Sequence, residues 1–217
     1  MPSERRPAPP VSVDAATVAE WTRALAEPVG DPGGGAAGAL ALALAASLVS
    51  MVAGYSVASA EPGEADRLGE RAGGLRTRAL ELADLDGRAS GRLSAAFRLP
   101  EGSERDREVH EASLAAASLC VQLTALAVPA VDDLERLAEV GNPALIADVV
   151  VATTLLRSAL VAFRTNIGVD LRMWAGDDDG GTAAAYPGIR EALDAAIDAA
   201  SRLDRLQQRL DGRVLPA

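Results

Sequence analysis

Apolar residues recur along most of this chain at spacings of three and four, which is the period of an amphipathic helix. Near the N-terminus, Val18, Trp21 and Leu25 follow this spacing. They predict a helix over 15–26, with Asp14 as its N-cap because an aspartate side chain can accept from the first backbone N–H groups of a helix.

Three further segments have the same period. The leucines of residues 64–93 predict a long helix with one solvent-exposed face. Residues 107–137 predict another helix, which Pro129 should kink or split because proline lacks the backbone N–H that an interior position donates. Residues 189–210 place their leucines on one stripe and predict the last helix.

Residues 32–60 carry no charged side chain, and such a stretch is long enough to cross a bilayer at about 1.5 Å per residue. A membrane span is therefore an alternative here. The segment is rich in alanine, glycine and serine, and it lacks aromatic or arginine anchors at its ends. We therefore predict a buried central helix and no membrane partner.

A clear helix boundary lies at Gly141, Asn142 and Pro143. Glycine closes one helix, asparagine caps the next, and proline is well tolerated at a first helical position. The apolar residues that follow predict a helix to about Met173, buried on most sides, and residues 175–188 then predict a solvated acidic loop.

The composition favours helices over sheets. Hydrophobic residues make up 49% of the chain while aromatic residues make up 3%, so alanine, leucine and valine supply most of the apolar content. We predict an all-α fold, a compact bundle of about six to eight helices around a long uncharged, alanine-rich central helix. Residues 1–12, rich in proline and arginine, are expected to be a disordered arm, and residues 13–217 a single helical domain.

The charge balance excludes several classes of function. The 217 residues carry 31 acidic and 21 basic side chains, a formal charge of −10, so the surface repels phosphate and we expect no nucleic-acid partner. All of the basic residues are arginine. The absence of lysine excludes Schiff-base chemistry, a lysine general base and a P-loop lysine.

The chain has one cysteine, Cys120, and one histidine, His110, so it has no internal disulfide and no His/Cys metal site. Apolar neighbours predict that Cys120 lies in the core, and charged neighbours predict that His110 faces solvent. The first ten residues lack the apolar stretch of a secretory signal, so we expect a cytoplasmic protein.

Four stretches of the chain, in order, resemble the cyclodeaminase/cyclohydrolase family. This family includes the C-terminal half of formiminotransferase-cyclodeaminase and bacterial methenyltetrahydrofolate cyclohydrolases. The stretches are PGGGAAGALALALAASLVSMVAGYS from Pro32, ALELADLDGRASGRLSAAFRLP from Ala79, VPAVDDLERLAEVGNPALIADVVVA from Val128 and NIGVDL from Asn166. With their spacers they cover residues 15–175.

The resemblance implies a helical bundle, a homodimer, and a tetrahydrofolate derivative as substrate with no further cofactor. The family's reactions hydrolyse the methenyl bridge of tetrahydrofolate, or close its formimino group with loss of ammonia. Both reactions pass through a tetrahedral carbon between two nitrogens. Such a site needs a carboxylate to stabilise a cation or move a proton, donors to position the ring system, and cations for the glutamate tail.

Two aspartates are the candidate catalytic residues, Asp86 and Asp148. Asp86 matches an acidic position of the family's second long helix. Asp84 is rotated from it by roughly 200° about a helix axis, so the two cannot act together. We expect Asp84 to pair at the surface with Arg88, one turn later.

Asp148 is the strongest single candidate because it lies in an apolar run, where a carboxylate is costly unless it is paired or used. The alternative is a buried structural pair with Arg157 or Arg164, which lie seven residues apart and so share one face of a helix.

Backbone N–H groups of the glycine turn, two amides and two arginines are the candidate groups for binding substrate. We expect this set to comprise Gly33, Gly34, Gly35, Asn142, Asn166, Arg157 and Arg164. Each has a structural alternative. Three glycines also permit a tight turn and close packing, Asn142 already serves as a cap, and the alternative for Asn166 is a hydrogen bond between helices.

The chain also departs from the family's pattern. It has Ala36 where relatives have serine, Glu101 where they have lysine, and Ala147 where they have serine. These changes remove groups that bind substrate while the packing pattern remains. Two hypotheses therefore stay open: a folate-dependent enzyme, and a catalytically silent or repurposed dimeric binding protein of the same fold.

Overall fold

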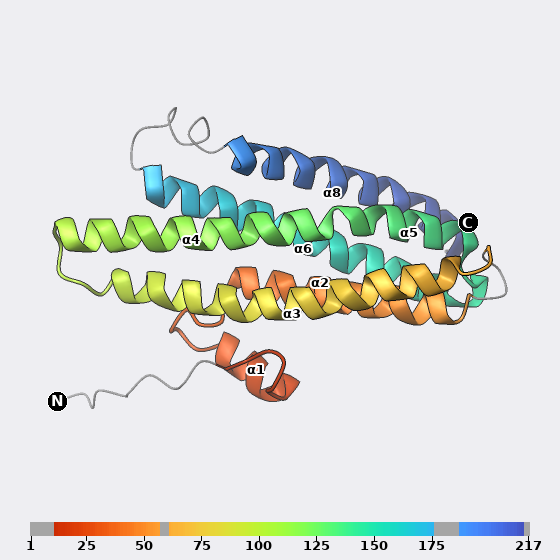
Figure 1. Cartoon of the computed structure of the whole chain (residues 1–217), viewed down its shortest axis with the longest axis horizontal. Coiled ribbons are helices and arrows are strands. Elements are labelled where there is room, and N and C mark those ends of the chain that lie inside the picture. The colour runs from red at the N-terminus through yellow and green to blue at the C-terminus, as the bar shows by residue number, and fades with distance from the viewer. Residues whose placement is uncertain (1–10, 57–60, 176–186, 215–217) are drawn as a thin grey trace.

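A computed structural model describes residues 11–56, 61–175 and 187–214 and shows a bundle of long helices, with no strand in these ranges (Figure 1). The predicted all-α fold is confirmed. Most of the predicted N-terminal arm, residues 1–10, and residues 176–186 of the predicted acidic loop lie outside the described residues.

The bundle is built from helices that run along its long axis (Figure 1). In chain order the elements are α1 (Val18–Leu25), α2 (Gly34–Gly54), α3 (Glu64–Ala96), α4 (Ser103–Ala127), α5 (Pro129–Val140), the short 3₁₀ helix η1 (Pro143–Leu145), α6 (Ile146–Ala175) and α8 (Pro187–Val214). Helix α2 packs on α3 and α6, α4 packs on the same two helices, and α8 covers α6. Helix α1 lies outside this bundle, beside α3 (Figure 1).

Helix α1 begins later than the sequence analysis predicted, and Asp14 is not its cap. Thr17 is the N-cap: its Oγ1 accepts from the Glu20 N–H at 3.2 Å, and the Glu20 carboxylate accepts from the Thr17 N–H at 2.9 Å. This reciprocal pair satisfies two donors where a lone aspartate would satisfy one, so the helix starts at Val18. Trp21, 4% exposed, then anchors α1 in the core.

Helix α2 fills the centre of the bundle because its residues are small. A Cβ atom on Gly38 would lie 2.9 Å from the Phe163 ring of α6, so glycine allows the two helices to approach closely. Leu42 and Val52 are fully buried. Another stripe of the same helix is open, with Leu44 49% and Met51 39% exposed.

Three helical stretches in the described residues are long and apolar enough to cross a membrane, judged by length and composition. They are Gly34–Gly54, Ser103–Val140 and Pro143–Met173. Between a third and about half of each apolar window is buried inside the bundle, at 56%, 44% and 33%. The prediction of no membrane partner therefore stays a prediction.

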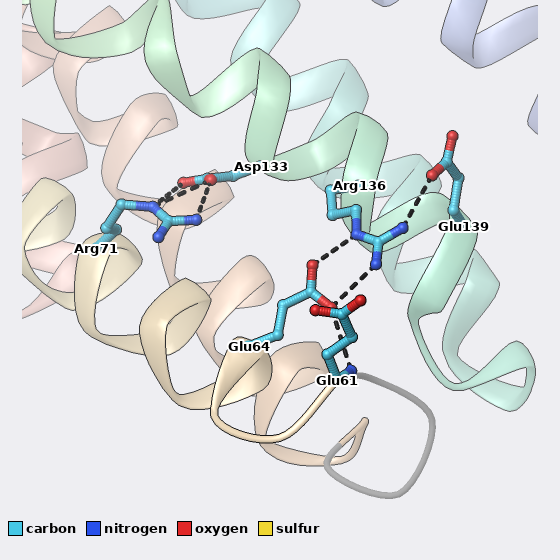
Figure 2. A network of polar contacts seen from close by, with 6 residues as sticks. All are labelled: Glu61, Glu64, Arg71, Asp133, Arg136 and Glu139. Carbon is cyan, nitrogen blue, oxygen red and sulfur yellow. Dashed lines mark hydrogen bonds and ion pairs between the residues drawn. The ribbon is translucent and has the colours of Figure 1, made fainter.

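Pro129 splits the predicted helix of residues 107–137 into α4 and α5, one of the two expected outcomes. Proline stands in the first turn of α5, where no partner is needed for the missing N–H. Ion pairs from other helices then hold α5 in place (Figure 2). Arg71 of α3 meets Asp133 at 2.6 Å, and Arg136 meets Glu64 at 2.6 Å.

The predicted boundary at 141–143 is confirmed. The Asn142 side chain accepts from the Ala144 N–H at 3.0 Å and caps η1, which begins at Pro143. The Asn142 N–H donates to Ser56 Oγ at 2.9 Å. This bond fixes the start of α6 beside the C-terminal end of α2.

Candidate functional site

The buried carboxyl group of Asp86 lies against the first turn of α2. Asp86 is 2% exposed, and a Cβ on Gly35 would stand 2.5 Å from its Oδ2 and 2.6 Å from its Cγ. Any residue other than glycine at position 35 would therefore displace the carboxyl group. The glycine turn thus allows close approach between α2 and α3, as the structural alternative required, and the N–H of Ala36, the next residue, stabilises the charged form of the acid.

Burial raises the pKa of Asp86 to about 6, because desolvation disfavours the charged form. Hydrogen bonds from the Ala36 backbone N–H and the Cys120 thiol lower the pKa of Asp86, but by less than burial raises it. The Cys120 Sγ lies 3.8 Å from Asp86 Oδ1, and burial is the main reason why the pKa of that thiol is also raised. Within the described part of the chain, Asp86 Oδ2 has no hydrogen-bond partner.

A second buried carboxyl group, Asp170 of α6, joins this site. Asp170 is 7% exposed, and burial together with the negative charge of Asp86 raises its pKa to about 7. Sequence reasoning missed this residue. The signal was present, since Asp170 is one turn after Asn166 and seven residues after Phe163, on the stripe that α6 turns inward.

Asn166 and Gly34 lie at the outer edge of the same site. A Cβ on Gly34 would stand 3.5 Å from the Asn166 side-chain amide, and Asn166 Nδ2 donates to the Ala162 carbonyl at 2.8 Å. Gly34 is exposed and Asn166 is half-buried. The structure therefore brings together Gly33, Gly34, Gly35, Asp86 and Asn166, five of the residues that the sequence analysis selected.

Asp148 does not join them, and the expectation that it is deeply buried is wrong. It is half-buried in the first turn of α6, where the partial positive charge of a helix N-terminus stabilises a carboxylate. Position 148 precedes Asp170 by 22 residues, about 33 Å along a helix. Within one chain, Asp148 and Asp86 belong to opposite ends of the bundle.

None of the remaining predicted binding residues forms a hydrogen bond or ion pair with Asp86 in the described residues. Asn142 caps η1 at the same end as Asp148. Arg157 forms an ion pair with Asp204 of α8, with Nη2 3.2 Å from Oδ2, so it is not the expected partner of Asp148. Arg164 is exposed on α6. The site around Asp86 thus has no arginine pair in the described residues.

Asp84 anchors the N-terminal segment, which corrects the expected pair with Arg88. The Asp84 carboxylate accepts from Ser12 Oγ at 2.5 Å and from the Val13 N–H at 2.7 Å. Residue 12, at the end of the expected arm, is therefore fixed on α3. A small hollow of about 330 Å³, including its open mouth, lies beside this contact, with Trp21 and Asp31 in its wall.

This geometry is suited to proton transfer and to a cationic ligand. Asp86 lies beside the Ala36 N–H at the start of α2, Asp170 is a second buried acid, and no basic side chain of the described residues forms an ion pair with either. Among the residues that the structure describes, no group of three or more His, Cys, Asp or Glu side chains is placed to hold a metal ion. The predicted positions of Cys120, buried, and His110, exposed, are confirmed.

The chain matches a known protein family, and its fold is similar to that of a solved structure. The family model described as formiminotransferase-cyclodeaminase matches residues 17–179. A search of curated proteins gave no match. Among solved structures, formiminotetrahydrofolate cyclodeaminase from Thermotoga maritima superposes with a TM-score of 0.75 at 24% sequence identity, and the match covers 94% of this chain and 100% of that one.

Proposed function

Because this chain belongs to the formiminotransferase-cyclodeaminase family, we propose that it acts on a one-carbon derivative of tetrahydrofolate. The reaction is hydrolysis of a methenyl bridge or closure of a formimino group with loss of ammonia. The observation that carries this proposal is the Asp86 carboxyl group, which is buried against the glycine turn with one oxygen unpartnered in the described residues.

Asp86 has the properties that this chemistry requires. The methenyl carbon belongs to an amidinium-like cation, which a carboxylate without a competing arginine can stabilise. A group with a pKa of about 6 can also accept and return a proton near neutral pH. The folate is the substrate, and the chemistry needs no resident cofactor.

The hydrolysis can be written with one proton acceptor. Water oxygen bonds to the methenyl carbon while the Asp86 carboxylate takes a proton from that water. One carbon–nitrogen bond then breaks, the released nitrogen takes a proton back, and the hydroxyl proton leaves to solvent as the formyl carbonyl forms. The cation and one water thus yield a neutral formyl product and one proton.

The outer edge of the site indicates where substrate approaches. Gly34 is exposed and Asn166 is half-buried, whereas the two carboxyl groups lie beneath them. Asn166 orients the ring system in this proposal, and the N–H groups of Gly33–Gly35 bind an oxygen or carboxylate of the ligand. Arg164, exposed on α6, remains a candidate for the glutamate tail.

The test is the loss of methenyl absorbance when 5,10-methenyltetrahydrofolate is mixed with purified protein. We expect the wild type to accelerate this loss and Asp86→Asn to reduce the acceleration by about 10²–10⁴-fold, the usual contribution of a general acid or base. The matched control is Asp148→Asn, which should keep the wild-type rate. A wild-type rate equal to that of buffer would refute the proposal.

A second candidate function is a catalytically silent dimeric binding protein, and the closed surroundings of Asp86 favour it. The same buried carboxyl group is only 2% exposed, so substrate must displace side chains to reach it. Ligand binding without turnover would identify this alternative. Tight binding of a tetrahydrofolate derivative by calorimetry, with no loss of methenyl absorbance above buffer, is the result that it predicts.

Both candidate functions include a homodimer. Exposed apolar residues on neighbouring helices of the bundle support this proposal. Helices α2 and α6 lie side by side behind α3 and α4 (Figure 1). Their open stripes carry Leu44 and Met51 on α2, and Val151 and Val169 on α6, each between 39% and 50% exposed. Apolar surface of this extent favours a partner, and the proposed partner is a second copy of the chain.

Light scattering tests the dimer. We expect a dimer at micromolar concentration, and Leu44→Glu should give a monomer because it places a charge in the centre of the stripe. Val18→Glu is the control, since Val18 is 79% exposed on α1, away from this face. A wild-type protein that is strictly monomeric would contradict the proposal.

A further inference from the structure

The hollow between α1 and α3 is separate from the Asp86 site, since neither Asp86 nor Asn166 lines it. Its wall includes Trp21 of α1, Arg88 of α3, and Asp31 from the chain that leads into α2. With its open mouth the hollow measures about 330 Å³. Ligand pockets usually measure about 300–1,000 Å³, so this hollow suits a ligand of the size of an amino acid and not a folate.

Two glycines of α3 make room for the Asp31 carboxylate in the wall of this hollow. A Cβ on Gly87 would stand 2.8 Å from Asp31 Oδ1, and a Cβ on Gly91 would stand 3.3 Å from Oδ2. Asp31 is half-buried, and among the described residues no group donates a hydrogen bond to its carboxylate. A carboxylate that has lost part of its hydration without gaining a donor is free to accept from a ligand.

Trp21 brings an unused hydrogen-bond donor to the same hollow. A buried indole N–H usually has an acceptor, yet the Trp21 side chain is only 4% exposed and its N–H bonds to no described residue. The protein does not enclose this nitrogen completely, because the enclosed atoms without a partner in the described residues are Asp86 Oδ2 and Ser113 Oγ. The Trp21 N–H is therefore available to a ligand in the hollow that its side chain lines.

Arg88 adds a positive charge to the wall without meeting Asp31. Burial raises the pKa of Asp31 and the Arg88 charge lowers it, but no ion pair or hydrogen bond joins the two side chains in the described residues. Asp84, the other acid of the wall, already accepts from Ser12 Oγ and the Val13 N–H. Two opposite charges thus line one cavity without neutralising each other.

This arrangement selects a ligand that carries both charges. A small anion would attract Arg88 but would be repelled by Asp31 and Asp84, and a small cation would meet the reverse. A molecule with an ammonium and a carboxylate avoids both costs. Its two ends then form charge-assisted hydrogen bonds, for which a guanidinium beside a carboxylate has the right shape.

We propose that this hollow binds a small zwitterion, a free α-amino acid with a short side chain. The Asp31 carboxylate accepts from the ligand ammonium, and the Arg88 guanidinium and the Trp21 indole N–H donate to the ligand carboxylate. The apolar walls formed by Val11 and Ala83 leave room for a short side chain only. Binding here requires neither a folate nor turnover, so it stands apart from the proposed function.

The experiment is a titration of the full-length protein with glycine, followed by the indole N–H signal of Trp21 in a proton–nitrogen NMR spectrum. The signal should shift and saturate, because the N–H gains an acceptor. N-acetylglycine lacks the ammonium and glycinamide lacks the carboxylate, so each should bind about tenfold more weakly or worse, the usual loss with a charged hydrogen bond. No saturable shift with glycine, or equal affinity for either analogue, would overturn the proposal.

Charge-removing variants test which residues hold the two ends. Asp31→Asn and Arg88→Gln should each weaken glycine binding by about 10–100-fold. The matched control is Arg76→Gln, which removes another exposed arginine of α3 that does not line the hollow and should bind glycine as the wild type does. Unchanged affinity in Asp31→Asn or Arg88→Gln, or an equal loss in Arg76→Gln, would count against the proposal.

Gly87→Ala tests the position of the Asp31 carboxylate while both charges remain. The new methyl group would displace Asp31 Oδ1, which is the end of a side chain that can rotate, so the fold should persist and glycine should bind more weakly. Glycine binding equal to that of the wild type in a folded Gly87→Ala protein would contradict the assigned role of Asp31.

Discussion

Gly35→Ala directly probes the contact between the glycine turn and Asp86. The added Cβ would stand 2.5 Å from Asp86 Oδ2 and 2.6 Å from Cγ, closer than such atoms can approach. The carboxyl group is only 2% exposed, so it has little room to rotate away. The variant should therefore be destabilised although alanine is the better helix former.

The size of the effect follows from two opposing contributions. Inserting a methyl group into a filled site costs about 1–3 kcal/mol. Replacing glycine by alanine in a helix returns about 1 kcal/mol. The free energy of unfolding should thus fall by about 1 kcal/mol, with a range of about 0–2. Gly74→Ala on α3, where nothing lies within 4 Å of the new Cβ, should instead raise it by about 1 kcal/mol.

The assay is thermal or urea unfolding of both variants, where each 1 kcal/mol corresponds to about 2–4 °C in a protein of this size. Repeating Gly35→Ala in an Asp86→Ala background completes a double-mutant cycle. If the collision is with the carboxyl group, the cost should disappear in that background. An equal cost in both backgrounds, or a stabilisation equal to that of Gly74→Ala, would refute the reasoning.

Three further predictions follow from the same structure. Asp86 and Asp170 have pKa values raised above that of an unfolded chain, so the native state holds protons that the unfolded state has lost. The free energy of unfolding should therefore fall as pH rises from 5 to 8, by on the order of 3 kcal/mol, and urea titrations that show a rise over this window would contradict this. The Arg71–Asp133 pair should give a coupling free energy of about 0.5 kcal/mol in a double-mutant cycle, because its arginine side chain is 55% exposed. This coupling should decline in 1 M salt, which screens exposed charges. A larger coupling that resists salt would be inconsistent with the exposure of the pair. The protein should be recovered from the supernatant after ultracentrifugation without detergent. Recovery only from membranes would favour a transmembrane helix, since three of the described helices are long and apolar enough to cross a membrane.

The sequence predicted the architecture well wherever a local signal determined it. Pro129 divides α4 from α5, and Asn142 caps η1, because both effects depend on the chemistry of one residue and its immediate neighbours. Where two local signals competed, the choice failed. Asp14 and Thr17 are both good caps, and the partner three residues after Thr17 decided between them.

The functional site was harder to predict because burial depends on the whole bundle. An apolar run suggested that Asp148 is deeply buried, but that residue lies in the first turn of its helix. Asp170 lies in a less apolar segment and is nearly fully buried, since α6 turns that face inward. Arg157 pairs with Asp204, which lies 47 residues later, and no local spacing in the sequence predicts this pair.

We propose that a folate binds beside Asp86 at the start of α2, and not at the opposite end of the bundle. A crystal structure of the protein with a bound tetrahydrofolate analogue tests this most directly. We expect the one-carbon position of the ligand within hydrogen-bonding distance of the Asp86 carboxyl group, with its ring system beside Gly34 and Asn166. Ligand density over Asp148 and Asn142 instead would contradict it.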